Sequence, residues 1–170
     1  MSMYLDIAEI PGESQSPNND WKAKIEVQTM AFDVSQRTSL EAGSGLISSG
    51  ATFGALHITK AMDKSTPLLF GRLAAGEPIA TVILRVSRPG GSATTGPVGG
   101  LFEAETYTMR NVIIGSYQTS GAPGPGGLPL ESWTLAFTAI SEVYHTVDAL
   151  GKMQPAQNAG YDIAAGKPTS

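Results

Sequence analysis

Long runs of strand-forming residues, each ended by glycine or proline, constrain this chain more than any other feature. The clearest run is 79–88, "IATVILRVSR", which the glycine-rich segment 89–100, "PGGSATTGPVGG", separates from the run 101–120. β-Branched residues favour strands, whereas clustered glycine and proline favour turns. Together with similar runs elsewhere, this pattern predicts about six strands and one short terminal strand. The other runs lie at 4–10, 22–34, 51–62 and 130–148, and the short one at 161–164.

In the run 22–34 the apolar residues move from one alternating set of positions to the other. Ile25 and Val27 occupy one parity of the strand, whereas Met30 and Phe32 occupy the other. A regular strand cannot place both sets on one face. We therefore expect either that both faces are covered, or that a bulge near Gln28 exchanges the faces.

One segment has the signals of a helix instead of a strand. Ser65 or Thr66 is a good N-cap, Pro67 suits the first helical position, and Gly76 suits the end. Asp63 precedes them, where its charge favours the positive end of the helix dipole. These signals predict a short helix over about 66–75, which we interpret as a structural element and not as an acid–base site.

The helix has one apolar side, formed by Leu68, Leu69 and Leu73 at helical spacing. Such a side needs a surface to pack against, and a curved sheet offers one. We therefore predict a mainly β protein: a single-domain β-barrel of two antiparallel sheets, with the helix packed on its side. A chain of 170 residues suits one domain, so we expect residues 1–170 to form it.

Composition limits the partners of the chain. Eleven basic against fifteen acidic residues give a formal charge of −4, with no basic cluster, which argues against nucleic-acid binding. No apolar run is long enough for a membrane-spanning helix, and the N-terminus has no signal-peptide pattern. Charged residues are 15% of the chain, a low share that suits a surface partly covered by other subunits.

Chemistry-bearing residues are few. Cysteine is absent, and His57 and His145 lie far apart without the spacing of a metal site. Ser14 lacks the glycine-flanked turn of a nucleophilic serine, and the glycine-rich run 89–100 lacks the ending of a phosphate-binding loop. We therefore expect no catalytic residue, no metal and no cofactor, and we expect the protein not to be an enzyme.

Several segments, in order, resemble the haemolysin-coregulated protein (Hcp) family, the tube proteins of type VI secretion systems. The most specific is 59–70, "TKAMDKSTPLLF", which is similar to the family's Thr-Lys-x-x-Asp-Lys-Ser-x-Pro segment. Supporting pieces are "PGES" at 11–14, Trp21 before "IEV" at 25–27, "MAFDVSQ" at 30–36, and "GYDI" at 160–163. In this resemblance Asp63, Ser65, Thr66 and Pro67 form the family's helix-capping motif.

The resemblance implies a particular assembly. Hcp-like subunits form homohexameric rings with a central channel, and the rings stack into a tube. A contractile sheath surrounds the tube, a VgrG-type spike tips it, and small effector proteins travel in the channel. The protein would assemble in the cytoplasm and leave the cell without a signal peptide, with no nucleic acid bound and no insertion into a membrane.

Two residue sets follow as hypotheses about this assembly. If Met30, Phe32 and Val34 face the core, then Ala31 and Asp33 face away, and we expect these two to line the channel. The run 36–50 reads as a long, flexible loop, a kind of segment that is often functional. Its apolar residues suit a joint between rings. These residues are Leu40, Leu46 and Ile47.

Two other functions fit the same sequence pattern. One is the tube subunit of a phage-tail-like or extracellular contractile injection particle, which would share the fold. The other belongs to a different class: a small-ligand-binding β-barrel, or a barrel enzyme whose site combines His57 with a carboxylate. That protein would be a monomer or dimer with a closed pocket.

Overall fold

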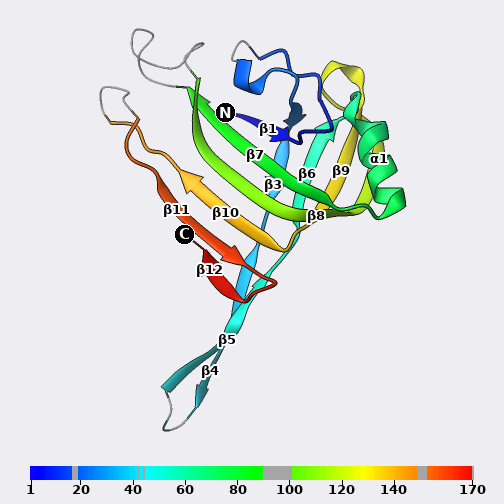
Figure 1. Ribbon diagram of the computed structural model, residues 1–170. Coiled ribbons are helices and arrows are strands. Elements are labelled where there is room, and N and C mark those ends of the chain that lie inside the picture. Colours follow the sequence, from blue (N-terminus) through cyan, green and yellow to red (C-terminus); the bar gives the residue numbers. More distant parts are fainter. Residues whose placement is uncertain (17–18, 42, 44, 90–100, 149–152, 170) are drawn as a thin grey trace.

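The computed structural model (Figure 1) describes residues 1–16, 19–41, 43, 45–89, 101–148 and 153–169. In these residues strands dominate, with one α-helix and two short 3-10 turns. The strands are β1 (Ser2–Asp6), β2 (Ile25–Val27), β3 (Thr29–Ala31), β4 (Val34–Glu41), β5 (Gly45–Phe53), β6 (Leu56–Ala61), β7 (Ile79–Pro89), β8 (Leu101–Pro123), β9 (Pro129–Ala136), β10 (Ala139–Tyr144), β11 (Gln157–Asp162) and β12 (Lys167–Thr169). The helix is α1 (Ser65–Ala75), and the turns are η1 (Asn19–Trp21) and η2 (Pro125–Gly127).

Two antiparallel sheets share the long strand β8. Sheet A has the order β12-β11-β10-β8-β7-β1-β2, and sheet B has the order β3-β6-β9-β8. The first part of β8 pairs with β7 and β10, and its second part pairs with β9. The register of β8 shifts between Ile114 and Ser116, on either side of Gly115. The strand passes from sheet A to sheet B just before this shift, because Val112 still pairs with β7 whereas Ile113 pairs with β9.

The change of parity in the second strand run has the same origin. β2 pairs with β1 in sheet A, whereas β3 pairs with β6 in sheet B, so the chain changes sheets at Gln28. Ile25 and Val27 are buried on one side of this point. Met30 and Phe32, on the other side, are half-buried against the same core. The exchange of faces near Gln28 therefore comes from a change of sheet between two strands and not from a bulge within one strand.

The core lies between the two sheets and is closed on one flank by α1. Trp133 is 1% exposed and contributes from β9, as its alternating apolar row suggests. In α1, Leu69 is buried and Leu73 is half-buried against the core, but Leu68 is 46% exposed. The helix lies beside β8 and β9 (Figure 1), so the expected packing on the side of the sheets is confirmed, with a narrower apolar side than predicted.

The structure confirms the mainly β class, the two antiparallel sheets and the single helix. The expected barrel, however, is not closed. Among the described strands, β2 and β12 at the edges of sheet A and β3 at the edge of sheet B each have one partner strand. β2 and β3 follow each other in the chain but belong to different sheets, and they do not pair with each other. The barrel is therefore open between these two strands. No described helix has the length and apolar character needed to cross a membrane.

Several strand boundaries differ from the expectation. The runs 51–62 and 130–148 are each interrupted, at residues 54–55 and 137–138, where the chain leaves one sheet. The first strand ends at Asp6, and the tail forms the paired strands β11 and β12. The segment 36–50, expected to be a loop, is the hairpin β4–β5. The expected hairpin loop at 89–100 lies, from residue 90 on, outside the described residues.

Candidate assembly surfaces

The β4–β5 hairpin projects from one end of the molecule (Figure 1). Its strands pair from Val34 opposite Phe53 to Leu40 opposite Leu46. Leu40 is 80% and Leu46 is 73% exposed, and Ile47 is exposed as well. Alternation of apolar and polar residues reveals a strand only when one of its faces is buried. Neither face of this hairpin is buried over most of its length, so the sequence pattern did not predict its strands. A role of the three apolar residues in ring stacking stays a prediction.

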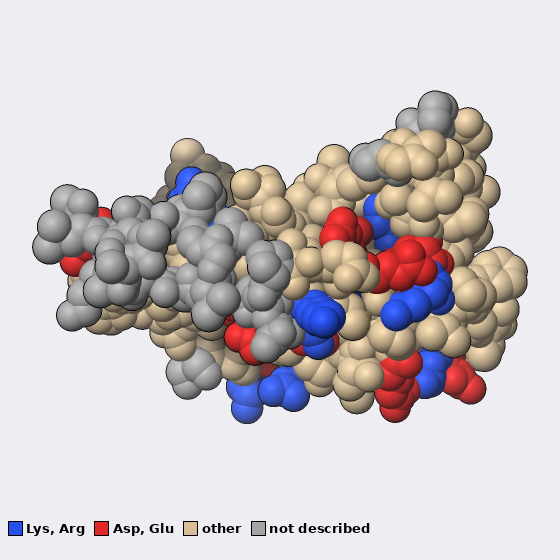
Figure 2. Space-filling view, turned by 90° about the horizontal axis from the view of Figure 1, so that it is seen from above, with Lys and Arg blue, Asp and Glu red and all other residues tan. Residues whose placement is uncertain are grey.

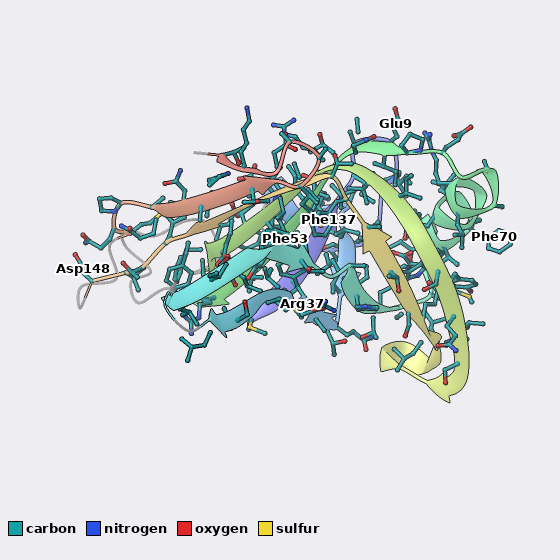
Figure 3. All side chains as sticks on the ribbon, turned by 90° about the horizontal axis from the view of Figure 1, so that it is seen from below. Glu9, Arg37, Phe53, Phe70, Phe137 and Asp148 are labelled. Atoms are coloured by element: carbon teal, nitrogen blue, oxygen red, sulfur yellow. The ribbon has the colours of Figure 1, made fainter. Side chains whose placement is uncertain are left out.

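Aromatic side chains hold the base of the hairpin to the body. Phe53 stacks on Tyr161 of β11, with ring centroids 4.9 Å apart, and Phe32 packs against Phe137 at 5.8 Å. Figure 3, seen from below, shows Phe53 and Phe137 near the centre of the molecule. The backbone N–H of residue 54 donates to the Asp33 carbonyl at 2.9 Å. These contacts fix the direction in which the hairpin leaves the sheets.

A cavity of about 220 Å³ lies beneath this base. Its walls are mainly aromatic and aliphatic, and include Phe32, Phe53, Tyr107, Ile140 and Tyr161. Small-molecule sites usually have volumes of roughly 300–1,000 Å³. The cavity is therefore small for a ligand-binding site, and it does not favour the alternative of a ligand-binding barrel.

Two carboxyl groups meet at the edge of this cavity. Glu105 on β8 and Glu142 on β10 form a side-chain hydrogen bond, and the hydroxyl of Tyr107 donates to Glu105 at 2.8 Å. Burial raises the pKa of Glu142, and the hydrogen bond and negative charge of Glu105 raise it further. Burial and the same carboxylates also raise the pKa of Tyr107. The pair is therefore stabilised when one carboxyl carries a proton.

Replacing Glu142 by Gln should stabilise the protein at neutral pH. A carboxyl whose pKa is raised by folding contributes stability at low pH, and this contribution is lost as the pH rises through the folded-state pKa. We expect the variant to exceed the wild type by about 0.5 kcal/mol at pH 7, a small value because the carboxyl is partly exposed to solvent. Urea unfolding at pH 7 and at pH 4 measures the difference, which should vanish at the lower pH. A gain of equal size at both pH values would contradict the assignment.

The outer face of sheet B carries small and neutral side chains. The register of β3, β6, β9 and β8 places thirteen described residues on this face, and Lys, Arg, Asp and Glu are absent from it. Hydroxyls bond across the strands, Thr29 with Thr59 at 2.6 Å and Ser116 with Thr134 at 2.8 Å. The thirteen are Thr29, Ala31, His57, Thr59, Ala61, Ile113, Ser116, Gln118, Ser120, Leu130, Ser132, Thr134 and Ala136.

The two residues expected to line the channel are both exposed. Ala31 lies on the outer face of sheet B, as alternation with the half-buried Met30 requires. Asp33 follows the end of β3, at the base of the hairpin, beside residue 54. The structure therefore separates them, since Ala31 belongs to the sheet and Asp33 to the junction. Their place in a channel remains a prediction.

The start of α1 is capped by Asp63, one of the residues of the expected capping motif. The Asp63 carboxylate accepts from the backbone N–H of Ser65 at 3.0 Å, and the carbonyl of Asp63 accepts from the N–H of Thr66 at 3.0 Å. Asp63 therefore caps the helix, whereas Ser65, Thr66 and Pro67 lie inside its first turn. Gly76 ends the helix in the left-handed conformation at φ +65°, as expected.

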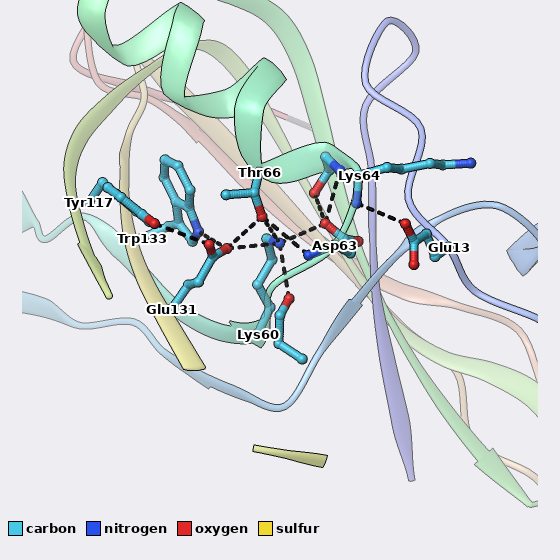
Figure 4. A network of polar contacts seen from close by, with 10 residues as sticks. Glu13, Lys60, Asp63, Lys64, Thr66, Tyr117, Glu131 and Trp133 are labelled. Atoms are coloured by element: carbon cyan, nitrogen blue, oxygen red, sulfur yellow. Dashed lines mark hydrogen bonds and ion pairs between the residues drawn. The ribbon is translucent and has the colours of Figure 1, made fainter. Parts of the chain in front are cut away.

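A buried ionic network lies below this cap (Figure 4). Lys60 and Glu131 are fully buried, and the Lys60 Nζ lies 3.0 Å from a Glu131 oxygen and 2.7 Å from Asp63 Oδ1. The Thr66 hydroxyl donates to Glu131 at 2.9 Å, and the Trp133 indole donates to the same carboxylate at 3.2 Å. The network joins β6, β9 and the first turn of α1, so it fixes the helix on the sheets.

Lys60 and Glu131 were not expected to act together. A signal was present, because Lys60 has the same parity as Leu56 and Ile58, and Glu131 has the same parity as Trp133. A charged residue among the inward-facing apolar residues of a strand either forms an ion pair or lies at the end of the strand, where water reaches it. Sequence alone could not join two such residues that are 71 positions apart.

The two histidines contact a hydroxyl and a backbone carbonyl. His57 Nδ1 is 3.2 Å from the Thr134 hydroxyl on the outer face of sheet B, and His145 Nδ1 is 3.5 Å from the carbonyl of Gln154. Within the described ranges, no three His, Asp or Glu side chains are grouped as a metal site would need. The arrangement therefore gives no support to a site built on His57.

The family comparison covers most of the chain. The family model described as "Type VI secretion system effector, Hcp" matches residues 4–144. This chain belongs to the Hcp family. The matched range includes the capping motif and both partners of the buried network, so the resemblance expected from 59–67 is confirmed. Membership assigns the chain to type VI secretion.

Solved structures agree with this assignment over nearly the full length of the chain. One solved structure, described as a type six secretion system protein, is 25% identical with a TM-score of 0.86, and the match covers 99% of each chain. Hcp1 from Salmonella typhimurium is 25% identical with a TM-score of 0.73, covering 99% of this chain and 98% of that one. A type VI effector from Yersinia pestis, 22% identical with a TM-score of 0.67, shares the fold over 94% of this chain and 98% of its own. A comparison with curated proteins finds no match.

Proposed function

We propose that this Hcp protein is the structural subunit of a type VI secretion tube. Residues 1–170 act as one domain, six copies close into a ring with a central channel, and rings stack into a hollow tube. A contractile sheath propels the tube behind a VgrG-type spike, and small effectors travel in its channel. The subunit is made in the cytoplasm and leaves the cell with the tube, without needing a signal peptide or a catalytic site.

The observation that carries the proposal is the outer face of sheet B. Thirteen mostly small or polar side chains form a broad surface that carries no described Lys, Arg, Asp or Glu. Such a surface suits a channel that carries different proteins. Fixed charges in a channel would bind cargo of the opposite sign and repel cargo of the same sign. We therefore place this face, with Ala31, on the channel.

The edges of sheet B support a closed ring. β3 pairs with β6 alone, and the second part of β8 pairs with β9 alone, so both edges lack a further partner strand among the described residues. An exposed edge strand pairs readily with another chain. Joining the β3 edge of one copy to the β8 edge of the next is a head-to-tail contact, which makes a ring when its rotation closes.

The exposed hairpin supports stacking of the rings. Leu40 and Leu46 are exposed near the tip of the hairpin, and exposed apolar groups of this size favour a protein partner. We assign these residues, with Ile47, to the joint between rings. We keep Asp33, at the base of the hairpin, as a candidate for the end of the channel face.

Light scattering and negative-stain images of the purified protein test the ring. We expect a mass near six subunits and hollow rings in the images. Because the chain has no cysteine, Ala31→Cys can be labelled alone. In assembled tubes it should react with a small maleimide but not with a maleimide on a long polyethylene glycol chain. Phe70→Cys, at an exposed site on α1 that points outward in Figure 3, should react with both.

Two results would contradict the proposal. A monomer without rings at all concentrations would favour a ligand-binding barrel. Rings in which Ala31→Cys reacts with the large reagent as fast as Phe70→Cys would keep the ring but remove this face from the channel.

A further inference from the structure

One residue on the outer face of sheet B can change its charge. Of the thirteen described residues on this face, His57 alone has an ionisable side chain. It is exposed, near the start of β6, and lies between Ala31 on β3 and Thr134 on β9. Imidazole is the side-chain group that ordinarily gains its charge between about pH 8 and pH 5. Acidification can therefore make this face positive.

Two hydroxyl groups hold the imidazole ring of His57. Its Nδ1 lies 3.2 Å from the Thr134 hydroxyl oxygen, and the Ser116 hydroxyl donates to that oxygen at 2.8 Å. A hydroxyl can donate one hydrogen bond and accept two. Thr134 therefore donates to Nδ1 when the imidazole is neutral, and accepts from Nδ1–H when it is charged. Both states keep the contact, so protonation adds charge to the face without requiring the strands to move.

The described neighbours of His57 on this face carry no charge. On β3, β6 and β9 they are Thr29, Ala31, Thr59, Ser132, Thr134 and Ala136. Beyond the end of β3, Asp33 continues the row of Ala31, and its carboxylate lies against residue 54 at the base of the hairpin. By contrast, the end of the molecule seen in Figure 2 carries acidic and basic side chains close together. A charge on His57 is therefore not balanced within the thirteen residues of its own face.

We propose that the outer face of sheet B becomes positive at acidic pH through His57 and then binds proteins with acidic surfaces, which it leaves unbound at neutral pH. The inference rests on the proposed function, because a ring repeats His57 in every subunit around one channel. Walls that carry charge of one sign focus the field between them and raise the local concentration of opposite charges by about tenfold or more. The surrounding pH then decides whether acidic cargo is retained in the channel.

Collisional quenching tests the charge beside His57. Ala31 lies directly opposite His57 in the pairing of β3 with β6. Because the natural chain contains no cysteine, Ala31→Cys can carry a single uncharged fluorophore. In assembled rings at low salt, we expect quenching by iodide, an anion, to increase about twofold from pH 8 to pH 6. Quenching by acrylamide, which is neutral, should stay constant.

Two histidine variants of the labelled chain make this result specific. His57→Gln keeps a hydrogen-bonding side chain but removes the ionisable group, so the increase in iodide quenching should disappear. The matched control is His145→Gln, which removes the other histidine of the chain, whose Nδ1 lies 3.5 Å from the carbonyl of Gln154. This control should keep the full increase.

Sedimentation of assembled tubes with fluorescent poly-L-aspartate tests the partner. This polymer stays ionised over the same pH range, so a change in binding reports a change in the protein. We expect unlabelled tubes to bind it about tenfold more tightly at pH 6 than at pH 8. The gain should be lost in His57→Gln and kept in His145→Gln, and poly-L-lysine should show no gain.

The outcomes separate this inference from the proposed function. Light scattering at both pH values shows whether each variant forms rings. An equal rise in iodide quenching with and without His57, or rings whose affinity for poly-L-aspartate does not rise at pH 6, would overturn the inference and leave the ring intact. Failure of the wild type to form rings would overturn the proposed function and this inference with it.

Discussion

Replacing Lys60 by Met should destabilise the folded protein by about 3–5 kcal/mol, because the change leaves a buried carboxylate without its cation. Lys60 and Glu131 are both fully buried, and their closest charged atoms are 3.0 Å apart. Without Lys60 the buried Glu131 carboxylate keeps its neutral hydrogen-bond donors, such as Thr66 and Trp133, but has no cation to balance its charge. Urea unfolding, followed by far-UV circular dichroism at one protein concentration, measures the loss.

Two controls make this result specific. Lys64→Met changes the neighbouring lysine of the same motif, whose side chain is exposed, and should alter stability by no more than about 0.5 kcal/mol. In the double variant Lys60→Met with Glu131→Gln, the neutral amide oxygen still accepts hydrogen bonds from Trp133 and Thr66, and the fully buried carboxylate is gone, although Asp63 still loses its cation. We therefore expect it to lose less stability than the two single changes together. A loss below about 1 kcal/mol for Lys60→Met would show that the pair is not buried as described.

Replacing Leu69 by Ala should cost about 2–5 kcal/mol, which is the range for deleting a large apolar side chain from a packed core. Leu69 is 1% exposed and is the residue by which α1 enters the core. Its neighbour Leu68 is 46% exposed, so Leu68→Ala removes the same atoms from solvent-facing surface and should change stability by no more than about 0.5 kcal/mol.

The midpoint of urea unfolding measures both leucine variants, with the slope of the transition expected to stay constant. Equal losses for Leu68→Ala and Leu69→Ala would mean that the helix does not dock through Leu69. A loss for Leu68→Ala that occurs in rings but not in dissociated subunits would instead show that Leu68 lies in a contact between copies.

Local features of the fold were predictable because their causes are local. Glycine and proline end the strand runs, and the helix of about 66–75 occurs at Ser65–Ala75. Its end at Gly76 follows from backbone geometry. The change of parity near Gln28 was also readable, since it is visible in the alternation of a few neighbouring residues. The capping residue was less predictable, because Asp63, Ser65 and Thr66 can all accept from nearby N–H groups.

The β4–β5 hairpin could not be predicted from local sequence patterns. Val34–Glu41 and Gly45–Phe53 are paired strands with exposed faces, so they lack the alternation that one buried face imposes. Their apolar residues Leu40 and Leu46 were nevertheless recognisable as misplaced on a monomer. The sequence could therefore indicate a surface for another copy, but it could not show that this surface is a two-stranded hairpin that projects from the sheets.

The sequence by itself determined the β-rich class, the single helix and the family, because turn chemistry, helix capping and the motif 59–67 depend on residues close together in the chain. Tertiary structure decided which distant residues meet. It joined Lys60 to Glu131 and collected, on one face, side chains from four strands that include no described Lys, Arg, Asp or Glu. These pairings depend on strand order and register, which are selected by burial over the whole core and leave no short-range mark in the sequence.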